Sequence, residues 1–115
     1  MSQDLEQIRD AWLQAYYRGD IDQLRQYEHE HLQMIYEAKA MTESSLNRYE
    51  QIAHAVKNSV WKPQKPNIMI EEFEFDHDAN HCTVSLKSDQ AKTLIQELWV
   101  FDGAWKIIEL KVCKP

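Results

Sequence analysis

Hydrophobic and polar residues alternate with two different periods along the 115-residue chain. In the first half, apolar residues recur at the spacing of amphipathic helices, which predicts helices over residues 2–18, 20–27 and 42–58. Gly19 can end the first helix in the left-handed conformation, and Asp20 can cap the second. In the second half, a period of two predicts strands over residues 67–77, 82–88, 92–101 and 104–113.

The segment between the second and third helices has two interpretations. Leu32, Met34 and Tyr36 alternate with polar residues, which favours a strand over residues 30–40. Its glutamates, alanines and lysine favour helices, so a continuous helix through Met41 is the alternative. With the strand, the order is α-α-β-α-β-β-β-β. This order predicts a single α+β domain over residues 1–115, with three helices packed on one face of a curved, mainly antiparallel sheet that forms a cone-shaped barrel.

The last two strands are joined by Asp102 and Gly103, a pair typical of a two-residue hairpin turn. Such a turn pairs Phe101 with Ala104 and sorts the side chains onto two faces. One face then carries Ile95, Glu97, Trp99, Phe101, Ile108, Leu110 and Val112, and the other carries Leu98, Val100, Trp105 and Ile107. A three-residue loop is the alternative, and it would exchange the faces of one strand relative to the other.

The second of these faces is apolar and lies away from the helices in this register. A bare apolar patch of this kind marks an interface, and self-complementary patches commonly form twofold dimers. We therefore expect a homodimer formed through Leu98, Val100, Trp105 and Ile107. The alternative is that a different protein covers this face.

The composition of the chain excludes some classes of binding partner. A net charge of −6 and a pI near 5.3 argue against nucleic acid and anionic membrane surfaces. No signal peptide or membrane-spanning run is apparent, so we expect a cytoplasmic protein with Cys82 and Cys113 unbridged. His77, Asp78, His81 and Cys82 cluster around one turn, but their spacing matches no standard zinc pattern. We expect neither a metal nor a cofactor.

Two stretches carry a resemblance to a known family: Trp12-Leu-Gln-Ala-Tyr-Tyr-Arg-Gly-Asp-Ile-Asp-Gln-Leu24 and Trp99-Val-Phe-Asp-Gly-Ala-Trp-Lys-Ile107. Together with the order of elements, they resemble the nuclear transport factor 2-like (cystatin-like cone) superfamily. That superfamily includes steroid isomerases, dehydratases, polyketide cyclases and oligomerisation modules, so the resemblance implies a fold more than a function. It also implies a conical pocket enclosed by the concave sheet and the first and third helices.

The steroid-isomerase branch of that superfamily uses three groups in this pocket. Its oxyanion-binding tyrosine, its basic aspartate and its oxyanion-binding acid match Trp12, Tyr36 and Glu97 of this chain. Two of the three roles are lost, because an indole is not a phenol and a tyrosine is a poor base at neutral pH. Glu37 points to the opposite face of a regular strand and is not an easy substitute.

The candidate ligand pocket consists of four aromatic residues and one acid: Trp12, Tyr16, Tyr36, Trp99 and Glu97. A buried Glu97 should be protonated, bonded to a neighbour such as Tyr16, or open to a wet cavity. The alternatives are a structural partner or a carboxylate that reaches water, and aromatics that simply fill the core. We therefore favour a non-enzymatic binding or interaction module that can hold a small apolar ligand. The alternative is a lyase or isomerase that uses Glu97 on a small apolar substrate.

Overall fold

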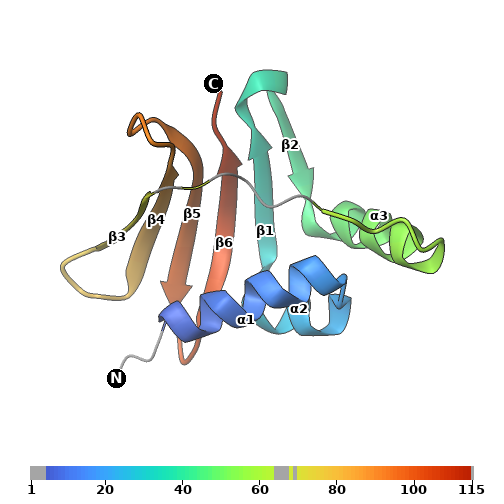
Figure 1. The fold of residues 1–115 in the computed structure, drawn as a ribbon. Coiled ribbons are helices and arrows are strands. Elements are labelled where there is room, and N and C mark those ends of the chain that lie inside the picture. Colours follow the sequence, from blue (N-terminus) through green and yellow to red (C-terminus); the bar gives the residue numbers. More distant parts are fainter. Residues whose placement is uncertain (1–4, 64–67, 69, 115) are drawn as a thin grey trace.

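The computed structural model describes residues 5–63, 68 and 70–114 (Figure 1). Its elements confirm the predicted α+β class. In chain order they are α1 (Leu5–Arg18), α2 (Ile21–Tyr27), β1 (Glu28–Tyr36), the 3-10 turn η1 (Glu37–Lys39), β2 (Met41–Ser44), α3 (Ser45–Lys57), β3 (Ile70–Phe75), β4 (His81–Lys87), β5 (Thr93–Phe101) and β6 (Trp105–Val112).

The strands form one six-stranded sheet in the order β2-β1-β6-β5-β4-β3. β1 and β6 run parallel, and every other neighbouring pair is antiparallel. The helix α1 crosses in front of the sheet, and α3 lies beyond β2 (Figure 1). The sheet does not close into the expected barrel, because β2 and β3 stand at its two edges and do not pair with each other. The result is an open cone.

The region around β1 decides between the two interpretations of the sequence. It is a strand, as favoured, but it ends at Tyr36. Ala40 takes a left-handed conformation, with φ of 50°, and turns the chain so that residues 41–44 pair antiparallel with β1. The predicted helix from Thr42 therefore begins later, at Ser45, and Ser44 caps it. Residues 2–4 of the first predicted helix and residues 67 and 69 of the strand predicted over residues 67–77 lie outside the described part of the chain.

The final hairpin has the alternative register. Phe101 pairs with Trp105, so the loop has three residues, and the pairing shifts once more between Leu98 and Trp99. Only Gly103 of the loop has positive φ, at 78°, whereas a two-residue turn of the expected type needs it at both positions. The predicted two-residue register is therefore wrong.

The three-residue loop changes the face that residues 105–107 occupy, because side chains alternate along a strand, and the second shift returns Leu110 and Val112 to the predicted face of Ile95 and Glu97. Trp105 and Ile107 lie on the same face as Trp99, and they are 7% and 0% exposed within a single protomer. Two of the four residues of the predicted dimer surface therefore belong to the core. Leu98 and Val100 face the other way, where they pair with Glu109 and Lys106. The outer face is thus mixed rather than uniformly apolar.

The core lies between α1 and the inner face of the sheet. Trp12 meets Trp99 edge to face, with ring centroids 5.5 Å apart, a favourable arrangement for aromatic pairs.

Gly19, between α1 and α2, has φ of 70°, and a Cβ there would meet Val56 at 2.5 Å and Trp61 at 2.9 Å. None of the described helices has the length and hydropathy needed to cross a bilayer.

Candidate functional site

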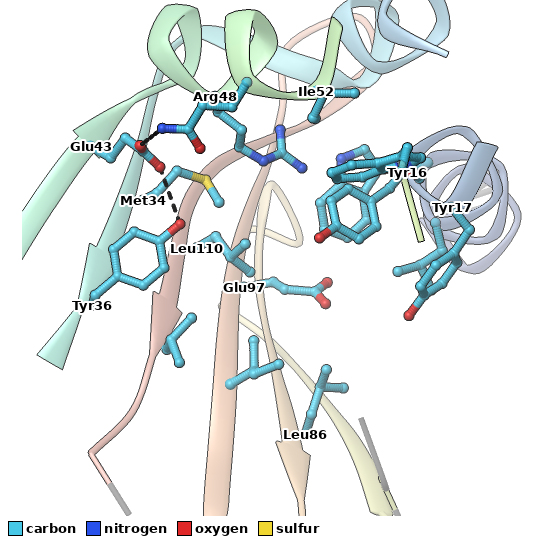
Figure 2. A pocket seen from close by; sticks show the side chains of 16 residues that line it. Tyr16, Tyr17, Met34, Tyr36, Glu43, Arg48, Ile52, Leu86, Glu97 and Leu110 are labelled. Carbon is cyan, nitrogen blue, oxygen red and sulfur yellow. Dashed lines mark hydrogen bonds between the residues drawn. The ribbon is translucent and has the colours of Figure 1, made fainter. Parts of the chain in front are cut away.

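A cavity of about 440 Å³ opens between the inner face of the sheet, α1 and α3 (Figure 2). Its volume lies within the range of about 300–1,000 Å³ that is usual for ligand pockets. Four of the five residues predicted for the pocket line it: Trp12, Tyr16, Tyr36 and Glu97. The fifth, Trp99, is fully buried behind Trp12 and does not reach the cavity. The other described lining residues are Leu13, Tyr17, Met34, Glu43, Arg48, Gln51, Ile52, Trp61, Leu86, Ile95, Leu110 and Val112.

Glu97 is held by a partner that the sequence did not reveal. Arg9 of α1 donates from Nε to Oε1 at 2.6 Å and from Nη2 to Oε2 at 2.9 Å. Trp99 Nε1 donates to the same carboxylate at 2.8 Å, and Arg9 Nη1 reaches Glu71 at 3.0 Å. Glu97 is 1% exposed, so this is a buried bidentate ion pair. The site therefore matches the alternative in which a structural partner holds Glu97, and that partner is Arg9 rather than Tyr16.

Burial alone would lower the pKa of Arg9. The hydrogen bond and charge of Glu97, followed by those of Glu71, outweigh it and hold the pKa of the guanidinium above its ordinary value. Arg9 therefore stays charged, and both oxygens of Glu97 face donors from α1 and β5.

A second buried ion pair surrounds Glu28, the first residue of β1. Glu28 accepts from Trp12 Nε1 at 2.8 Å, from Arg48 Nη1 at 2.8 Å and from the Tyr49 hydroxyl at 2.6 Å. Burial, and then the hydrogen bond and charge of Glu28, raise the pKa of Tyr49. The network ties α1, β1 and α3 together, and it uses the only indole donor of Trp12.

Tyr36 stands at the mouth of the cone. Its hydroxyl donates to Glu43 Oε1 at 3.2 Å, and Gln51 Nε2 donates to the other oxygen of Glu43 at 3.2 Å (Figure 2). Burial and the neighbouring Glu43 raise the pKa of Tyr36, so the phenol stays protonated at neutral pH. The three positions matched to the isomerase set thus all have their polar atoms bonded within the protein: Trp12 to Glu28, Tyr36 to Glu43 and Glu97 to Arg9.

Arg9, Glu28 and Arg48 were missed because hydrophobic periodicity says nothing about which charged residue a fold buries. A signal was nonetheless present. Arg9 falls between Leu5 and Trp12 at helical spacing, so it interrupts the apolar stripe of α1. Arg48 falls in the same way beside Ile52 on α3. A charged residue inside an apolar stripe needs a buried partner, although the sequence does not say which one.

The turn that carries two histidines is solvated. His81 Nδ1 lies 3.0 Å from Asp76 Oδ2, and both side chains are partly exposed. Within the described ranges, no three or more histidine, cysteine, aspartate or glutamate side chains gather as a metal-binding group.

No protein-family model and no curated protein matches the chain. Solved structures do match it over nearly its whole length. An NTF2-like protein from Cytophaga hutchinsonii is 16% identical, with a TM-score of 0.73 and 100% of both chains covered. A putative ketosteroid isomerase from Shewanella frigidimarina is 15% identical, with a TM-score of 0.61, covering 93% of this chain and 92% of that one. The association domain of C. elegans CaMKII is 9% identical, with a TM-score of 0.66, covering 97% and 94%.

The protein therefore has the NTF2-like, cystatin-like fold, as the resemblance implied. At these identities the likeness establishes the fold alone. The neighbours include an isomerase-like protein and an association domain, so the fold does not choose between an enzyme and an interaction module.

Proposed function

We propose that this protein is a binding module that holds a small, largely apolar ligand in its cone and does not transform it. The observation that supports the proposal is the 440 Å³ cavity, whose walls are mostly aromatic and aliphatic. Pockets of this size and lining, with a few placed polar groups, are typical of small-molecule sites.

The alternative, a lyase or isomerase that uses Glu97, is opposed by the contacts of that residue. A catalytic acid or oxyanion-binding group must direct a proton toward the substrate. Both oxygens of Glu97 instead accept hydrogen bonds from Arg9, and one of them also accepts from Trp99. Tyr36 is no replacement base, because its raised pKa keeps it protonated.

Thermal-shift screening against small hydrophobic compounds tests the proposal. Leu110 of β6 lines the cavity, and a Leu110→Trp substitution would fill it. Leu46 is 65% exposed on α3 and does not line this cavity, so Leu46→Trp is the matched control. We expect compounds that raise the melting temperature of the wild type and of Leu46→Trp, but not of Leu110→Trp. A screen without stabilising compounds, or equal shifts in all three proteins, would contradict the proposal.

Self-association in the cytoplasm remains part of this proposal, with a revised surface. Trp105 and Ile107 are buried in the protomer, so Leu98 and Val100 are left of the four residues. The similarity to the CaMKII association domain supports the idea at the level of the fold. Sedimentation at micromolar concentration tests it, and Val100→Lys should shift a dimer toward monomer. A wild-type protein that sediments as a monomer would leave a different protein partner as the occupant of this face.

A further inference from the structure

The two buried arginines near the cone use their guanidinium groups differently. Arg9 donates from Nε and Nη2 to Glu97 and from Nη1 to Glu71. Arg48 also donates from Nη1, to Glu28 at 2.8 Å. Its Nε and Nη2, however, have no hydrogen-bond partner among the residues that the structure describes. The edge with which Arg9 binds a carboxylate is thus open in Arg48.

The open edge of Arg48 faces the cavity. The side chain is 8% exposed, it lines the cone, and Figure 2 shows its guanidinium pointing inward from α3. Across the described chain, no side-chain nitrogen or oxygen is both fully buried and unpaired. The free N–H groups of Arg48 are therefore reached from the open volume. Its guanidinium carbon lies 5.2 Å from the ring centre of Tyr16, a contact that orients the group.

We propose that this edge of Arg48 binds the carboxylate of the ligand, so that the cone takes a small carboxylic acid with an aromatic or aliphatic body. The inference rests on the proposed function and specifies its ligand class. A planar guanidinium edge matches the two oxygens of a carboxylate, and such charge-assisted pairs are the stronger hydrogen bonds of proteins. Met34, Ile52 and Leu110 would contact the body of the ligand.

The charge of Arg48 is itself matched by Glu28, so the assignment rests on the open edge of its guanidinium and not on net charge. Arg48 is the only cationic side chain among the described residues that line the cavity. The negative charge of Glu97 is matched by Arg9, and Glu28 lies behind Arg48 among three donors. Glu43 at the mouth is bonded by neutral groups alone within the described chain, so it is where an amine would bind instead. Acid against amine is therefore the decisive comparison.

Three probes of similar size make that comparison with the wild-type protein: phenylacetate, neutral phenylacetamide and cationic 2-phenylethylamine. Isothermal titration calorimetry at neutral pH gives the three dissociation constants. We expect phenylacetate to bind at least about 10-fold more tightly than phenylacetamide, because hydrogen bonds to charged groups contribute more than neutral ones. The amine should bind more weakly than the acid.

Arg48→Lys keeps the positive charge that faces Glu28 but removes the two-pronged edge. It should weaken phenylacetate binding about 10-fold and leave phenylacetamide nearly unchanged. Arg18→Lys is the matched control, because the Arg18 side chain is 60% exposed on α1 and does not line this cavity. If circular dichroism shows that Arg48→Lys does not fold, the three dissociation constants of the wild-type protein test the carboxylate assignment alone.

Each outcome separates this inference from the proposed function. Equal binding of acid and amide, tightest binding of the amine, or an Arg48→Lys variant that binds phenylacetate like the wild type would overturn the carboxylate assignment. The same holds if hydrophobic compounds of the thermal screen bind while phenylacetate does not, although the binding function would then stand. If no compound binds in either experiment, both proposals fail.

Discussion

Replacing Arg9 with methionine tests the buried ion pair between Arg9 and Glu97. Arg9→Met keeps most of the aliphatic volume of the side chain and removes three hydrogen-bond donors from two glutamates. Glu71 is 47% exposed in its side chain, so water can replace its partner. Glu97 is 1% exposed and keeps only the indole of Trp99, so the loss falls on this carboxylate.

The expected loss follows from that burial. Removing one partner of a buried ion pair leaves an uncompensated charge and costs about 3–5 kcal/mol of unfolding free energy. A domain of this size has about 5–15 kcal/mol in total, so the variant should fold but be much less stable. With a urea dependence of about 2 kcal/mol per molar, a loss of about 4 kcal/mol lowers the unfolding midpoint by about 2 M.

Urea denaturation followed by tryptophan fluorescence and circular dichroism measures this loss, and the same helix supplies the control. Arg18 is 60% exposed in its side chain and lies 3.9 Å from Asp20, so Arg18→Met should cost less than about 1 kcal/mol. The double variant Arg9→Met/Glu97→Gln removes the unpaired charge while keeping an acceptor for the indole. It should recover about 2 kcal/mol relative to Arg9→Met.

The reasoning would be refuted if Arg9→Met lost no more stability than Arg18→Met. It would also fail if the double variant were less stable than Arg9→Met, because the cost would then come from packing rather than from the charge left on Glu97.

Three further predictions concern the backbone, a thiol and the revised register. In urea denaturation, Gly19→Ala should lower the unfolding free energy more than Gly103→Ala does. Both positions have positive φ, which gives each variant a backbone penalty of about 1–2 kcal/mol, but only Gly19 is crowded by side chains. Equal losses of unfolding free energy would contradict the close packing at Gly19. Burial raises the pKa of Cys82 to about 11, so at pH 8 iodoacetamide should modify the partly exposed Cys113 and spare Cys82 until urea unfolds the protein. An unfolded cysteine has a pKa of about 8.5, so the contribution of the buried Cys82 thiol to stability should be complete below that pH and disappear as the pH rises through about 11. Rapid labelling of Cys82 in the native protein, seen by peptide mass spectrometry, would argue against its burial. Trp105→Glu places a charge in the protomer core and should lower the unfolding free energy to the same extent at every protein concentration. If the variant changed only the sedimentation coefficient, the result would instead support the two-residue turn and a Trp105 side chain at a dimer interface.

The register of the final hairpin, between β5 and β6, shows where local sequence signals are no longer sufficient to predict the structure. Asp102 and Gly103 were enough to predict a hairpin, and the hairpin is present. They do not state the loop length, because a turn of two or three residues is compatible with the same letters. The three-residue loop is selected by burial: it places Trp105 and Ile107 on the inner face beside Trp99. A one-residue difference in the loop thus moved half of the predicted dimer surface into the core.

By itself, the sequence determined the elements whose causes lie within a few residues. These include the helix end at Gly19, the cap at Asp20, the alternating strands, the α+β class and four of the residues that line the cone. Tertiary structure alone decided β2, the open sheet and the pairing of charges. Arg9 and Glu97 are 88 positions apart and Glu28 and Arg48 are 20 apart, and no local pattern links them. The buried charges pair according to which strand and helix meet in space, and that follows from packing the whole chain.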